Sequence, residues 1–106
     1  MLVAFSLAPS GGPAQDGLPS DSVHEAVAAA VRIVRDSGLP NHTDAMFTTI
    51  EGEWDEVFET IRRASEAVGQ YGTRVSLVLK ADIRPSHSDE LLGKVERLEA
   101  AIAENS

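Results

Sequence analysis

Hydroxyl and carboxylate side chains that could bind a small polar molecule occur together in one short segment. Thr48 and Thr49 are followed closely by Glu51, and hydroxyls beside a carboxylate supply both donors and acceptors of hydrogen bonds. The residues alone favour a plain structural interpretation, because threonines are ordinary β-strand residues and a glutamate is favourable just before a helix. Other features of the sequence are needed to tell whether these residues bind a ligand or only end a strand.

Other kinds of chemistry find little support in the residue types. The three histidines, His24, His42 and His87, have no spacing typical of zinc ligands, and the chain has no cysteine. Ser10-Gly11-Gly12 lacks the lysine that ends a phosphate-binding loop, and no nucleophile lies at a recognisable spacing from a base. We therefore expect no metal, no cofactor and no enzymatic activity.

The charge balance narrows the choice of partners. Seventeen acidic residues against nine basic ones give a net charge of −8, which opposes binding to nucleic acid and to anionic membranes and slightly favours a cationic ligand. The apolar opening segment is too short for a membrane span and has no basic start. A cytoplasmic protein with a single domain, residues 1–106, is expected.

Hydrophobic periodicity predicts four strands and three amphipathic helices. The strands are expected at residues 2–8, where Pro9 ends the first, at two places within 41–51 with a bend near Ala45, and at 73–83. The helices are expected from Ser22, where a capping box with Glu25 starts the first, to Gly38, then over 53–68, and after serine caps at Ser86 and Ser88. A long surface loop should occupy residues 9–20.

The order β-α-β-β-α-β-α indicates an α+β fold. Its first six elements are those of a ferredoxin-like plait (βαββαβ), an antiparallel sheet packed against helices on one face, and the last helix is an extra C-terminal element. The helix-side face should carry the bulky residues Val3, Phe5, Leu7, Val75, Leu77 and Leu79. The open face should carry the small or polar residues Ala4, Ser6, Ser76, Val78 and Lys80, and these suggest that something covers it.

Three stretches resemble the thiamine-binding (MTH1187/YkoF-like) protein family: Val3–Pro9, Phe47–Glu53 and Arg74–Arg84, with Thr48-Thr49-Ile50-Glu51 as the most specific piece. The resemblance implies a non-catalytic binding protein for thiamine or its hydroxymethylpyrimidine moiety. It also implies a homo-oligomer, a dimer or tetramer, that forms through the sheet face.

An aminopyrimidine needs hydroxyl or amide donors facing a carboxylate or carbonyl on an apolar bed. The expected ligand-binding residues, on the open sheet face near a subunit interface, are Ser6, Met46, Thr48, Thr49, Glu51, Ser76 and Lys80. Met46 shares that face only if Thr48 lies there.

Two other functions stay open. Phe47 stands where the family usually has a small residue, so the chain could be an oligomeric interaction or regulatory module with a lost or different ligand. A small enzyme with Glu51 as acid or base is the third hypothesis.

Two further groups of residues are expected to have structural roles. Lys80, Asp82 and Arg84 alternate along one strand, as the members of an ion-pair ladder would. Trp54 is expected to anchor a core or an interface.

Overall fold

The computed structural model describes residues 1–11, 20–84 and 90–104 of the chain. Its elements, in chain order, are β1 (Leu2–Ser10), α1 (Ser20–Asp36), β2 (Asn41–Thr43), β3 (Thr48–Glu51), α2 (Trp54–Val68), the 3-10 turn η2 (Gly69–Tyr71), β4 (Arg74–Asp82) and α3 (Glu90–Glu104). The order confirms the predicted one. Most of the expected loop over residues 9–20, namely 12–19, and the caps at Ser86 and Ser88 fall outside the described residues.

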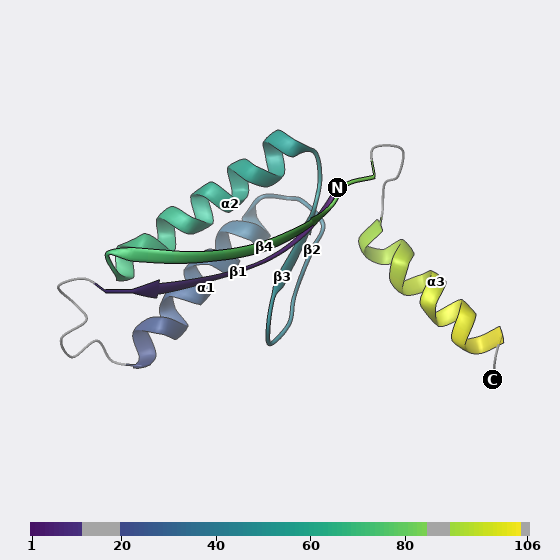
Figure 1. Ribbon diagram of the computed structural model, residues 1–106, viewed down its shortest axis with the longest axis horizontal. Coiled ribbons are helices and arrows are strands. Elements are labelled where there is room, and N and C mark those ends of the chain that lie inside the picture. The colour runs from purple at the N-terminus through teal and green to yellow at the C-terminus, as the bar shows by residue number, and fades with distance from the viewer. Residues whose placement is uncertain (12–19, 85–89, 105–106) are drawn as a thin grey trace.

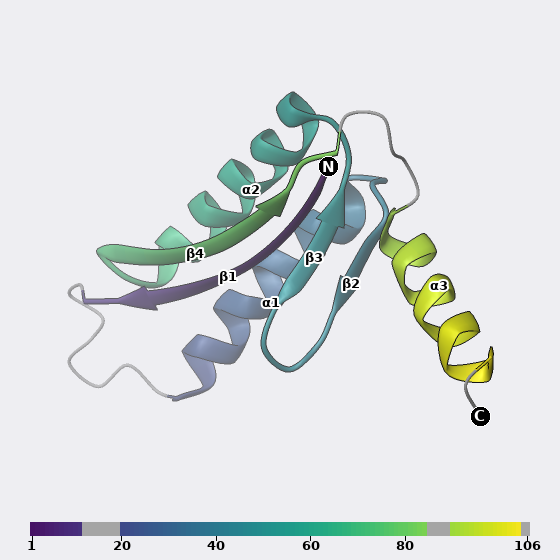
Figure 2. The ribbon, with the colours of Figure 1, turned by 45° about the vertical axis from the view of Figure 1, so that its right-hand side comes forward.

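The four strands form one antiparallel sheet in the order β2-β3-β1-β4, and α1 and α2 cover the same face of it (Figure 1). This arrangement confirms the ferredoxin-like plait. The other face is open, and α3 stands beside the sheet instead of covering it, with its start near the end of β3 (Figure 2). No helix in the described part of the chain is long and apolar enough to cross a membrane.

The core lies between the sheet and the two covering helices. Alternate residues of the central strands point into it, led by Val3, Phe5 and Ile50, and they meet Val34 of α1 and Val57 of α2. These side chains are removed almost completely from water, which is the main stabilising contribution to a domain of this size.

A second cluster joins the two helices to each other. It consists of Ala26 and Ala30 from α1 and Ala64 and Val68 from α2. This cluster packs the two helices against each other, and Leu7 of β1 and Val75 of β4 pack against it from the sheet.

Residues at the start of α2 and just after α1 have the conformations that usually begin and end a helix. The Glu56 carboxylate accepts a hydrogen bond from the backbone N–H of Glu53 at 2.8 Å, which closes a capping box at the start of α2. Gly38, which follows α1, has φ of +80°, a conformation that an L-residue with a side chain rarely adopts.

Two predicted boundaries are wrong, while the predicted faces of the strands are confirmed. Pro9 does not end β1, because the strand has lost its β3 neighbour by then and proline is tolerated where one side of a strand is unpaired. The first helix starts at Ser20, before the expected Ser22. Leu77 and Leu79 do share the helix-side face with Leu7 and Phe5, but they are 41% and 37% exposed because β4 is an edge strand.

Candidate ligand-binding site

A notch opens where two strands of unequal length lie side by side. β3 begins at Thr48, opposite Phe5, so from Ser6 onward β1 is paired with β4 alone among the described strands. The turn between β2 and β3 and the middle of α1 border the space that is left, a half-open hollow of about 140 Å³. The residues that line this notch are Phe5, Ser6 and Leu7 of β1, Val27, Ala30 and Val31 of α1, and 43–48 of the hairpin.

Hydroxyl groups form the polar part of the notch. The Oγ1 atoms of Thr43 and Thr48 lie 3.2 Å apart across the hairpin, close enough for one to donate to the other. Thr48 is buried. Ser6 also lines the notch, but it alternates with Phe5 along β1 and is in register with Val78, so its side chain belongs to the open face of the sheet. Polar groups thus face a wall that is otherwise made largely of hydrocarbon.

The turn at the rim of the notch is held by Asp44. Its backbone N–H donates to the carbonyl of Phe47 at 2.9 Å, and its Oδ1 accepts from the backbone N–H groups of Phe47 and Met46 at 2.9 and 2.8 Å. These amide donors, Phe47 first, lower the pKa of Asp44 below its ordinary value. Met46 is 74% exposed at the tip of the turn.

The open face of the sheet holds a different, shallower hollow. Strand pairing sets His42, Thr49, Ala4 and Lys80 in one row across the four strands. A hollow of about 450 Å³ lies over part of this row, lined by Leu2, Ala4, Thr49, Lys80, Ala81 and Asp82. Its side chains are exposed or half-buried.

Glu51 lies one row further along the open face, opposite Leu2. It is buried, and its Oε1 accepts a hydrogen bond from the backbone N–H of Leu91 at 3.4 Å, at the start of α3. In this structure the carboxylate therefore links β3 to the last helix.

The predicted site residues separate into three groups. Ser6, Met46 and Thr48 line the notch, Thr49 and Lys80 line the open-face hollow, and Glu51 and Ser76 line neither. The condition that placed Met46 on the open face is not met, because Thr48 is in register with Phe5 on the helix side.

Sequence reasoning missed Thr43 and Asp44, which also line the notch. One sequence signal could have identified them. Thr43 and Thr48 are placed symmetrically about a four-residue turn, and an aspartate that opens such a turn is typical of an Asx cap.

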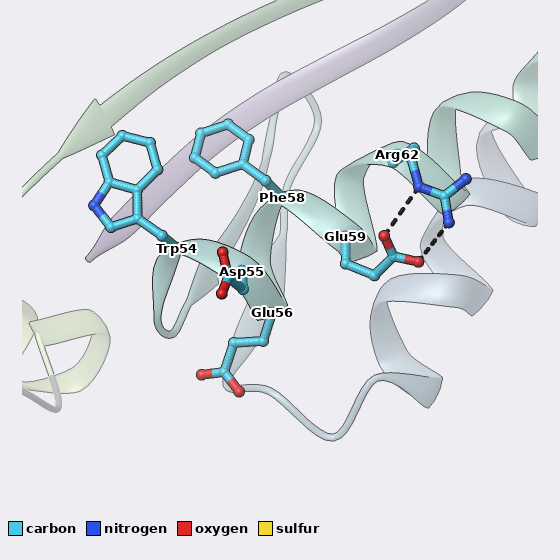
Figure 3. Close-up of a pocket in the computed structure, with 6 residues that line it drawn as sticks. All are labelled: Trp54, Asp55, Glu56, Phe58, Glu59 and Arg62. Atoms are coloured by element: carbon cyan, nitrogen blue, oxygen red, sulfur yellow. Dashed lines mark hydrogen bonds and ion pairs between the residues drawn. The ribbon is translucent and has the colours of Figure 1, made fainter.

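A further hollow lies on the outer side of α2 (Figure 3). The rings of Trp54 and Phe58 stack there, with centroids 5.1 Å apart and planes 18° from parallel. Trp54 is 54% exposed, so it is not a core residue. On the next turns Arg62 bonds Glu59 at 2.9 Å and pairs with Glu66, and these carboxylates raise the pKa of Arg62. Such exposed pairs contribute little to stability.

The fold and the notch define a small α+β plait with a ring-sized cavity at the step between two strands. The model of one protein family, described as "Thiamine-binding protein", matches residues 3–99. The chain belongs to the thiamine-binding protein family, as the resemblance predicts.

Individual relatives agree with this assignment. UPF0045 protein Mb1933 of Mycobacterium bovis is 49% identical over 100 residues, which cover 93% of this chain and 91% of the relative. UPF0045 protein sll0230 of Synechocystis is 34% identical over 86 residues, covering 80% and 70% of the two chains. Hypothetical protein MJ1052 of Methanocaldococcus jannascii has a similar structure, with a TM-score of 0.75, 26% identity and coverage of 92% and 94%.

Proposed function

We propose that this protein binds thiamine or its hydroxymethylpyrimidine moiety in the notch, without catalysing a reaction. Membership of the thiamine-binding protein family supports a ligand of this kind. The observation that carries the proposal is the cavity of about 140 Å³ between β1, α1 and the hairpin. A cavity of about 150 Å³ can hold a benzene molecule, so a pyrimidine ring is of the right size.

The polar groups of the notch suit an aminopyrimidine. The ring offers an amino donor and nitrogen acceptors. The hydroxyls of Thr43 and Thr48 can each donate or accept, and the backbone of β1 beyond Phe5 has no strand partner on the notch side in the described part of the chain. Apolar walls from α1 would exclude water and strengthen these hydrogen bonds.

The position of Glu51, the residue considered as a catalytic acid or base, supports binding without chemistry. Glu51 is not among the residues that line the notch, and its Oε1 accepts a hydrogen bond from the backbone N–H of Leu91.

The test is isothermal titration of the protein with thiamine and, separately, with hydroxymethylpyrimidine. Thr48→Val removes a hydroxyl from the notch, and Thr49→Val makes the same change on the opposite face of the sheet. Loss of one hydrogen bond should weaken binding about fivefold to tenfold in Thr48→Val and leave Thr49→Val close to the wild type. The reverse pattern, together with weak binding in Glu51→Gln, would place the site on the open face, and no saturable heat from either ligand would refute the proposed function.

We also propose that the protein is a cytoplasmic homo-oligomer, a dimer or tetramer, that forms through the sheet face. The open face carries no covering layer in the described part of the chain, and Val78 on it is 55% exposed. The apolar stripe of α3 is also exposed at Val95, Leu98 and Ile102. A second copy would remove both surfaces from water.

The alternative function is an oligomeric interaction module that lacks this ligand. Phe47 favours it, because an aromatic ring lines the notch where the family usually has a small residue. Phe47→Gly separates the two functions. Thiamine binding that occurs only in this variant would support the interaction module.

A further inference from the structure

We propose that the outer edge of β4 pairs with the same edge of a second copy of this chain, antiparallel and centred on Val78, so that two sheets become one. The inference goes beyond the proposed function. The contact uses neither the notch nor the packing of one open face on another, and its partner is defined by the sequence of β4 itself.

The first support is the character of this edge. β4 is nine residues long and pairs with β1 on one side, and no strand pairs with its other side in the described part of the chain. Residues 76–80 are all exposed, Leu77 and Leu79 among them. A long edge strand is a template for a further strand, and monomeric proteins usually shorten, bend or cover such an edge. A partner strand would also remove the two leucines from water.

The second support is the self-complementary sequence of β4. The helices of both copies stay on one face of a joined sheet only if the register changes in steps of two, so few pairings are possible. The pairing centred on Val78 matches the whole strand, Arg74–Asp82, with itself. On the helix side it places Leu77 opposite the partner's Leu79, so apolar side chains meet across the joint.

The charges of β4 favour the same register. Arg74 and Asp82 are the two ends of the strand and lie on the open-face side, and the pairing about Val78 places each opposite the other residue in the second copy. Opposite charges in this position stabilise a sheet. A register shifted by two residues either places Arg74 opposite the partner's Lys80, where like charges repel, or leaves Arg74 beyond the end of the partner's strand.

The third support is an aromatic surface beside this edge. α2 runs along β4 in both ribbon views (Figures 1 and 2). Trp54 and Phe58 stack on the outer side of α2 (Figure 3), and Trp54 is more than half exposed. A sheet joined at β4 brings the α2 helix of the second copy to this side, which removes part of the aromatic surface from water.

The first experiment exchanges the charges at the two ends of β4. The variants are Arg74→Asp, Asp82→Arg and the double variant Arg74→Asp/Asp82→Arg, and sedimentation velocity over a dilution series gives the dissociation constant of each dimer. Within one chain the two positions are about 26 Å apart, at about 3.3 Å per residue. This is more than two screening lengths at physiological salt, so the two side chains influence each other only across the joint.

Each single change should weaken the dimer about tenfold, because it places two like-charged pairs across the joint. The double variant restores both pairs and should return to within about twofold of the wild type. The control is Arg32→Asp, which makes the same charge change on the exposed side of α1 and should leave the dissociation constant unchanged.

The second experiment measures the register directly. The chain has no cysteine, so Leu77→Cys and Leu79→Cys each introduce a single thiol. Opposite residues of paired strands have Cβ atoms about 5 Å apart, whereas diagonal neighbours are about 7 to 8 Å apart, too far for a disulfide. When the two variants are mixed before oxidation, they should crosslink to each other more than either does with itself. Both positions lie on the helix side, so contact between open faces does not bring them together.

Three results would overturn the inference and leave ligand binding in the notch intact. The first is a wild type that stays monomeric at micromolar concentration. The second is a dimer that the single charge changes do not weaken or that the double variant does not restore. The third is a mixture of the two cysteine variants that crosslinks no more than each variant alone, since the copies would then meet through another surface or in another register.

Discussion

Thr43 and Thr48 face each other across the hairpin with their Oγ1 atoms 3.2 Å apart, on the side of the sheet that the helices cover. Thr49 follows Thr48 in the chain and lies on the open face, in register with Ala4. Two adjacent threonines of one motif therefore belong to different surfaces. The period of two in a strand makes this separation unavoidable.

The hydroxyl pair should be measurable as a coupling in stability. A double-mutant cycle with Thr43→Val and Thr48→Val is expected to give a coupling free energy of about 0.5 to 1.5 kcal/mol, because each single change leaves the other hydroxyl without its partner. Urea unfolding of the four proteins provides the values. A control cycle with Thr49→Val in place of Thr48→Val should show no coupling, and a coupling near zero in the first cycle would mean that the two hydroxyls do not bond in solution.

Asp44 predicts a pH dependence of stability. Its pKa is lowered in the folded protein, so the ionised carboxylate stabilises the fold at pH values above the unfolded pKa. This contribution is lost as the pH falls from about 4 through the lower, folded pKa. Asp44→Asn should therefore lose less stability than the wild type between neutral and acidic pH, measured by urea unfolding at several pH values. Parallel pH curves for the two proteins would contradict the hydrogen bonds assigned to Oδ1.

Replacing Gly38 and Gly69 by alanine should have different effects on the stability of the protein. Gly38 has φ of +80° and open space where a Cβ would lie, so Gly38→Ala meets backbone strain alone and should destabilise the protein by about 1 to 2 kcal/mol. Gly69 has helical dihedral angles, φ −60° and ψ −16°, and a Cβ there would lie 3.8 Å from Val75 Cγ2.

Gly69→Ala should therefore leave stability unchanged or raise it by up to about 1 kcal/mol, because alanine reduces the freedom of the unfolded chain. Thermal and urea unfolding of both variants check the two signs. A neutral Gly38→Ala would show that the chain can turn there in another conformation.

The sequence supports the prediction of the elements and of their order, because each element carries its own periodicity. Val3 and Phe5 alternate, and the stripes of α1 and α2 repeat at helical spacing, so the two faces of β1 could be assigned without a structure. Local patterns were sufficient wherever one residue and its near neighbours determine the conformation.

The notch could not be predicted in the same way, because it depends on the register between distant strands. It exists because Thr48 meets Phe5, which leaves β1 without β3 from Ser6 onward. No pattern within either strand specifies that pairing. The exposure of Leu79 has a similar origin, since only the sheet order makes β4 an edge.

The open face should control assembly if a second copy covers it. Val78 lies on that face, in register with Ser6, and more than half of it is exposed. Val78→Glu would place a charge in the middle of the proposed interface, where burial without a partner is costly. Light scattering should then show a lower mass than that of the wild type, which is expected at two or four times the chain mass.

The control variant is Gln70→Glu, which adds the same charge on the exposed turn after α2 and should leave the mass unchanged. Circular dichroism of both variants verifies that each chain is folded, and a wild type that is monomeric at micromolar concentration would contradict assembly through the open face.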